Sequence, residues 1–314
     1  MSWLNRPAAP PTIWRGAGGV RSGWRALLFG GALLAFLFGV ALELARLAGP
    51  WLRASLAAGQ VGPGFVVANE LMLLVPVVGA TLLMARLEGV SPLAFGLAGG
   101  RRARHLAWGG LSALVALGAL LLGLVALGEG RFTYGGLAPP SALGYALMWG
   151  LACALTGLAE ELCFRGYLLG VLGRGLGAWP AALITALLFA LAHGLNRGES
   201  RIGFAMLLAA GLLLVVSRWR TGALWWAIGF HAAWDWGENF LFGTPDSGQL
   251  CAGALWHFSA FGPVWLTGGL TGPEGSVLAL PVLGAAAAMV FWVCPAQGRR
   301  KPRVNQMIDL DQSP

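Results

Sequence analysis

Two adjacent carboxylates and an arginine interrupt one of the most apolar stretches of this sequence. Glu160, Glu161 and Arg165 lie between the apolar runs 146–155 and 166–172. Charged side chains near the centre of a bilayer are costly, and they are usually paired and functional. Neighbouring residues on a helix point about 100° apart, so the two glutamates cannot have the same role. The i,i+4 spacing of Glu161 and Arg165 favours an ion pair, which leaves Glu160 to face a cavity.

A carboxylate held out of water suits general acid–base chemistry. Taken alone, the Glu160/Glu161 pair has an equally good structural interpretation, in which it joins neighbouring helices as a polar knot. Other ionisable groups in the apolar segments are needed to distinguish the two interpretations.

Three such groups lie in later apolar segments. His193 ends the run 189–193, and His231 and Asp235 stand i,i+4 on one face of a predicted helix. That spacing can chelate a metal ion or let the carboxylate orient the imidazole. Each residue alone is commonly a packing residue. Together with the two glutamates they supply a base, a group that orients water and groups that stabilise an oxyanion, which water-activated hydrolysis requires.

The elements that must position these residues are membrane helices. The 314 residues are 57% hydrophobic and only 11% charged, with a mean hydropathy of +0.70, whereas soluble domains carry about 25% charged residues. The composition predicts an all-α, polytopic membrane helix bundle with about eight transmembrane helices in a single domain over 26–298, flanked by tails at 1–25 and 299–314. The candidate spans are 26–48, 61–85, 105–128, 142–172, 178–196, 202–217, 222–242 and 276–294.

The distribution of basic residues predicts that both termini are cytoplasmic. Of the 21 lysines and arginines, 15 fall in the two tails and in the loops on the same side, 4 fall on the opposite side and 2 lie within spans. This topology accounts for the net charge of +8, so a nucleic-acid partner is not expected. The apolar patch 255–266, within the long loop 243–275, is expected to lie on the membrane or to re-enter it. The Arg-rich, Lys-poor composition indicates a multi-pass protein of a bacterial inner membrane.

Three motifs on separate spans carry a family resemblance. Glu-Glu-x-x-x-Arg at 160–165, Phe-x-x-x-His at 189–193 and His-x-x-x-Asp at 231–235 resemble the CPBP family. These are CAAX-protease and bacteriocin-processing (Abi) intramembrane proteases, related to the type II CAAX prenyl endopeptidase. The resemblance covers about 145–242. It implies an intramembrane endopeptidase that acts on a membrane-associated peptide or protein, with a lipidated substrate as the eukaryotic precedent and membrane lipid as a partner.

The resemblance also implies roles for the residues. Glu160 with His193 would activate the attacking water, and His231 with the residue at 235 would stabilise the oxyanion. The two supporting residues of the site would be Glu161 and Arg165.

The last motif position departs from the eukaryotic relatives, which often have Asn where this chain has Asp235. An ionised aspartate would repel an oxyanion, so Asp235 must be protonated, orient His231 or bind a metal, and Asn239 is a candidate substitute donor. The family has been described as metal-dependent, and the sequence leaves a metal-free and a metal-dependent mechanism open. In the second case a divalent metal such as zinc is the expected cofactor, with ligands from the set Glu160, His193, His231 and Asp235.

Two other function classes compete with the protease. A non-catalytic immunity or scaffold protein of the same family would keep the polar knot for its structure. A proton-coupled transporter would use the intramembrane carboxylates, but the halves of the sequence show no inverted repeat. One geometric question stands against the protease: Glu160 is predicted near the middle of its span and His193 near the outer end of its own.

Overall fold

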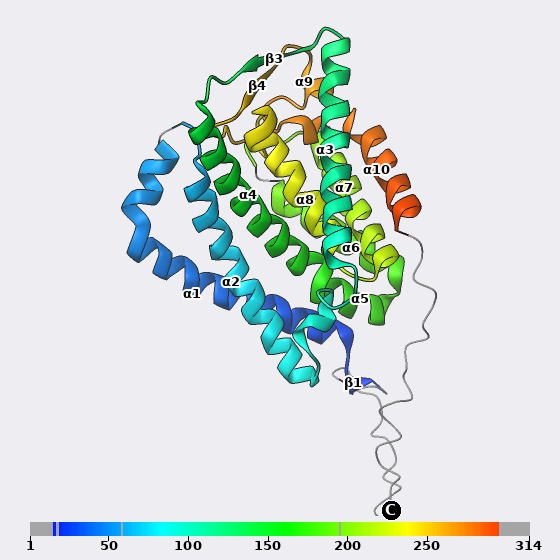
Figure 1. Cartoon of the computed structure of the whole chain (residues 1–314). Coiled ribbons are helices and arrows are strands. Elements are labelled where there is room, and N and C mark those ends of the chain that lie inside the picture. Colours follow the sequence, from blue (N-terminus) through cyan, green and yellow to red (C-terminus); the bar gives the residue numbers. More distant parts are fainter. Residues whose placement is uncertain (1–14, 17–18, 58, 195, 295–314) are drawn as a thin grey trace, which may run out of the picture.

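A computed structural model of the chain describes residues 15–16, 19–57, 59–194 and 196–294 (Figure 1). The predicted tail 299–314 and most of the predicted tail 1–25 lie outside the described residues. The long helices run side by side, with β3, β4 and α9 at one end of the bundle and β1 near the other.

The chain forms helices wherever the sequence is continuously apolar. The helices are α1 (Ser22–Ala57), α2 (Pro63–Glu88), α3 (Arg102–Ala126), α4 (Pro139–Glu161), α5 (Leu169–Leu176), α6 (Ala178–His193), α7 (Arg201–Thr221), α8 (Trp225–Trp236), α9 (Val264–Thr267) and α10 (Ala279–Val293), with the short segments η1 (Pro92–Phe95), η2 (Leu162–Leu168), η3 (Gly237–Phe242) and η4 (Pro273–Gly275).

Five segments of the described chain are long and apolar enough to cross a membrane, which identifies the chain as a membrane protein. They are Ser22–Trp51, Pro63–Glu88, Arg102–Ala126, Pro139–Leu176 and Arg201–Thr221. Two shorter apolar helices, α6 and α10, and the pair α8–η3 occupy the other three predicted spans. The total of eight crossings and the cytoplasmic position of the termini therefore stay predictions.

Helix α8 lies at the centre of the bundle, packed against α3 and α4. Glycine makes the approach to α3 close: a Cβ at Gly109 would collide with the backbone of α8, and a Cβ at Gly229 would collide with the backbone of α3. On the other side, a Cβ at Gly157 of α4 would lie only 3.0 Å from the carbonyl oxygen of Ile228. Small residues let membrane helices approach closely, and here they fix the helix that carries His231.

The helix that carries the two glutamates is interrupted directly after them. Segment η2 is π-helical, and inside it Gly166 leaves helical geometry altogether, at φ −78° and ψ −107°. Single π-helical turns often occur at functional sites because they redirect side chains. The predicted span 142–172 is thus two helices, α4 and α5, joined through a kink that contains Arg165.

The secondary structure of the described chain is helical, as predicted, except for two small two-stranded sheets. Strands β3 (Gly130–Tyr134) and β4 (Trp256–Ala260) pair antiparallel, with Phe132 opposite Phe258; β1 (Arg15–Gly16) and β2 (Gly19–Val20) form a second short ladder. The apolar patch 255–266 supplies β4 and the start of α9, and its predicted position on or in the membrane stays a prediction. Its aromatic residues pack on β3, and the Phe132 and Phe258 ring centroids are 4.9 Å apart.

Candidate active site

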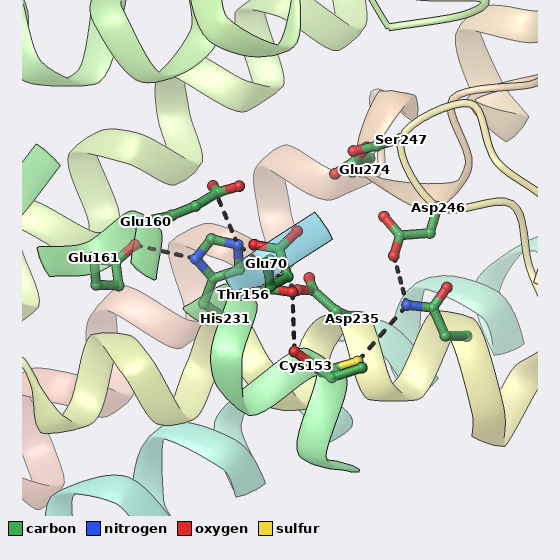
Figure 2. Close-up of polar contacts among 12 residues, drawn as sticks. Glu70, Cys153, Thr156, Glu160, Glu161, His231, Asp235, Asp246, Ser247 and Glu274 are labelled. Carbon is green, nitrogen blue, oxygen red and sulfur yellow. Dashed lines mark hydrogen bonds and ion pairs between the residues drawn. The ribbon is translucent and has the colours of Figure 1, made fainter. Parts of the chain in front are cut away.

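The structure gathers all six predicted site residues from four elements. Glu160 and Glu161 end α4, Arg165 lies in η2, His193 is the last residue of α6, and His231 and Asp235 stand one turn apart on α8. In Figure 2 the His231 ring lies between the carboxylates of Glu160 and Glu161. The depth mismatch expected from the sequence does not arise, since a carboxylate oxygen of Glu160 and Nε2 of His193 are 3.6 Å apart.

Glu161 is a structural hub beneath the site. Its Oε1 accepts from Nη1 of Arg165 at 3.0 Å and from Nδ1 of His231 at 3.1 Å. The side chains of Glu161 and Arg165 are fully buried, and the guanidinium lies 4.3 Å from the centroid of the Phe189 ring. The predicted i,i+4 ion pair is therefore present. Because Nδ1 of His231 donates to Glu161, the other nitrogen of the ring is directed into the site.

Glu160 faces the two histidines. Its Oε2 lies 3.6 Å from Nε2 of His193 and 3.8 Å from Nε2 of His231. Nδ1 of His193 is 2.9 Å from the carbonyl oxygen of Phe189, so Nδ1–H donates to that carbonyl and Nε2 points toward Glu160. A separation of 3.6 Å is longer than a direct hydrogen bond. Glu160 and His193 therefore face one another at the cavity wall without bonding directly.

Asp235 belongs to two groups. Its Oδ2 lies 3.8 Å from Nε2 of His231. In the described part of the chain, one trio of metal-type side chains, Asp235, Glu238 and Asp246, brings its ligand atoms within 4.8 Å of one another. Neither oxygen of the fully buried Glu238 has a hydrogen-bond partner among the described residues. Of the predicted metal ligands only Asp235 is in this trio, so the geometry favours oxygen ligands for any divalent ion bound there.

The site opens into a cavity of about 940 Å³. Glu160, His193, His231 and Asp235 line it, whereas Glu161 and Arg165 are not among its lining residues. This division matches the predicted one between groups that face substrate and groups that support them, while the catalytic role of each residue stays a prediction.

Sequence reasoning left several cavity carboxylates out of the site. Glu70 of α2 lines the cavity, and as the one charged residue in its predicted span it carried a usable signal. Asp246 and Glu274 also line it. Both come from the loop after α8, where no motif marks them. Burial raises the pKa of Asp246, and burial together with the nearby Asp246 raises the pKa of Glu274 to about 7.

Asn239 was predicted as a substitute hydrogen-bond donor to the oxyanion. Its side chain instead binds the loop that follows η3. Its Nδ2 donates to Oδ2 of Asp246 at 2.7 Å, and its Oδ1 accepts from the thiol of Cys251 at 2.7 Å. Both polar atoms of its amide are thus engaged with the loop. Asn239 therefore orients Asp246.

The segment that contains this site matches a known protein family. Residues 142–237 match the family described as type II CAAX prenyl endopeptidase Rce1-like. The matched range contains all six predicted site residues and nearly coincides with the 145–242 predicted to carry the resemblance. No curated protein matches the chain. The predicted relationship to the CAAX-protease family is confirmed over this segment.

Proposed function

From the match to the type II CAAX prenyl endopeptidase family over residues 142–237, we propose that this membrane protein is an intramembrane endopeptidase. It hydrolyses a peptide bond of a membrane-associated peptide or protein by direct attack of water. The observation that supports this most is the convergence of Nε2 of His193 and Nε2 of His231 on one oxygen of Glu160, at 3.6 and 3.8 Å, at the wall of a large cavity.

In this proposal the attacking water is held by Glu160 and His193, whose Oε2 and Nε2 face one another at 3.6 Å. Glu160 takes a proton from the water as the oxygen attacks the peptide carbonyl carbon, which forms a carbon–oxygen bond and a tetrahedral oxyanion. Collapse of that intermediate breaks the carbon–nitrogen bond. The proton on Glu160 passes to the leaving amine, so the carboxylate is restored.

In this proposal His231 stabilises the oxyanion. An imidazolium donates from both nitrogens: Nδ1–H donates to Glu161, and Nε2–H is left for the developing charge. Arg165 neutralises Glu161 and thereby holds the ring in this orientation. In this scheme Asp235 balances the charge of His231 at 3.8 Å and does not contact the oxyanion.

A metal ion is not required by this scheme. If a divalent cation binds, Asp235, Glu238 and Asp246 would hold it, and it would supply Lewis-acid stabilisation of negative charge. The steps assigned above to Glu160 and His231, and the water held beside His193, do not involve it.

Peptide cleavage by the purified protein tests the proposal. Wild-type protein in detergent is incubated with a peptide library, and the new termini are identified by mass spectrometry. Cleavage that is lost in Glu160→Gln and retained in Glu43→Gln, an exposed carboxylate of α1 outside the cavity lining, supports it. A folded wild-type protein that cleaves no peptide would instead favour the immunity or scaffold function.

A further inference from the structure

The loop residues that line the cavity lie at one end of the bundle, and we take that end as its mouth. All lining residues that come from loops belong to the connections after α1, after α6 and after η3, within 59–61, 196–197 and 245–274. These connections bind one another: the amide of Val61 donates to the carbonyl of Leu250 at 2.8 Å, and the hydroxyl of Thr271 donates to the carbonyl of Gly198 at 3.0 Å. We call this ring of loops the rim. It lies at the end that carries β3 and β4 (Figure 1).

Most arginines of the described chain lie at the opposite end. They lie in or directly beside the terminal turns of the helices there: Arg21, Arg25, Arg86, Arg101, Arg102, Arg104, Arg174, Arg218 and Arg220. Several of them connect neighbouring helices at this end. Arg174 pairs with Glu88 at 3.4 Å, and Arg220 donates to the carbonyl of Phe291 at 3.0 Å. None of these nine is among the residues that line the cavity.

The rim end is poor in basic residues. Its arginines are Arg53, Arg131, Arg197 and Arg201, and Arg197 is the one that lines the cavity. Loops rich in Lys and Arg remain in the cytoplasm during membrane insertion. The arginine-rich end is therefore the cytoplasmic end, and the cavity mouth faces the other side of the membrane.

We infer that the active-site cavity is filled from the extracytoplasmic side. Resting on the proposed function, this assigns a substrate class: a segment of an exported or membrane-anchored protein that is exposed outside the cytoplasm. A soluble cytoplasmic protein could not reach Glu160, because the described loops at the arginine-rich end contribute no residue to the cavity lining.

Cysteine labelling in spheroplasts tests this orientation without relying on activity. In a Cys251→Ser background the three other cysteines are buried. Gln249→Cys places an exposed thiol on the rim and Ala103→Cys places one at the arginine-rich end. With a membrane-impermeant sulfonated maleimide, we expect Gln249→Cys to label in intact spheroplasts and Ala103→Cys to label only after lysis. The reverse pattern, or labelling of both before lysis, would overturn the inference.

A second arm separates this inference from the proposed activity. The labelling is repeated with Glu160→Gln added, and the same pattern is expected because orientation does not depend on catalysis. Peptide is then supplied outside right-side-out and inverted vesicles. Cleavage in the right-side-out preparation alone supports extracytoplasmic access, and cleavage in the inverted preparation alone overturns it. If neither preparation cleaves, the proposed activity fails, while the labelling still decides where the mouth lies.

Discussion

Replacing Arg165 by methionine tests the hub beneath the site. The Arg165 and Glu161 side chains are fully buried, with Nη1 and Oε1 3.0 Å apart. At an effective dielectric constant of about 20, Coulomb's law gives an attraction of roughly 5–6 kcal/mol at that separation, much of which offsets the cost of burying both ions. Arg165→Met keeps a long apolar stem and leaves Glu161 as a buried carboxylate that has lost its guanidinium partner and keeps only His231. We expect a loss of about 3–5 kcal/mol in the free energy of unfolding.

The double variant Glu161→Gln/Arg165→Met provides the matched comparison. It removes both charges and retains an amide oxygen that can accept from Nδ1 of His231. We expect it to be about 2 kcal/mol more stable than Arg165→Met alone, because it leaves no buried carboxylate without its guanidinium partner. Equilibrium unfolding by denaturant in mixed micelles measures both values. A double variant no more stable than Arg165→Met, or an Arg165→Met protein as stable as wild type, would refute the reasoning.

Three further predictions follow from the packing, the loop and the hub. Gly109→Ala should lower the free energy of unfolding by about 1–3 kcal/mol, because its Cβ collides with α8, whereas Gly123→Ala on the same helix has free space and should cost nothing; equal losses would contradict the close approach. The raised pKa of Glu274, about 7 against 4.5, means that the folded state holds this proton more tightly than the unfolded chain. Stability should therefore fall as pH rises from 4.5 through 7, and Glu274→Gln should flatten that fall; an unchanged slope in denaturant titrations at pH 5 and 8 would count against it. Glu161→Gln should slow peptide cleavage by about 10–100-fold, the usual cost of losing a positioning carboxylate; a wild-type rate would remove its assigned role.

The sequence predicted which residues the structure brings together, because charge in an apolar span is rare and costly. Glu160, His193 and His231 were visible against their surroundings, and the i,i+4 spacing of Glu161 and Arg165 indicated their pairing. The apolar runs predicted where the helices lie, but they did not predict where each helix begins and ends. The first helix runs through Ser22–Ala57 where 26–48 was predicted, since a helix ends where capping or chain geometry changes and not where hydropathy falls.

The fold of the long loop after α8 could not be predicted from local sequence pattern. Strand β4 pairs with β3 across a sequence separation of more than a hundred residues, as in the Thr133 side-chain bond to His257. Phe132 and Tyr134, and likewise Trp256 and Phe258, alternate as strand residues do, but an isolated five-residue pattern does not name its partner. Asp246 and Glu274 reach the cavity only through this long-range folding. The kink in η2 also depends on a contact between distant parts of the chain. It is centred on Gly166, which packs against the backbone of Phe95.

The most direct test of the central claim is the rate of peptide cleavage by Glu160→Gln compared with wild type, on a peptide that the wild-type protein cleaves. The amide cannot accept the proton from water, and removal of a general base typically costs 10²–10⁴-fold. We predict a loss of at least about 10²-fold in kcat, a comparable loss for His193→Ala, and wild-type unfolding behaviour for Glu160→Gln. A folded Glu160→Gln protein that cleaves at the wild-type rate would contradict the account.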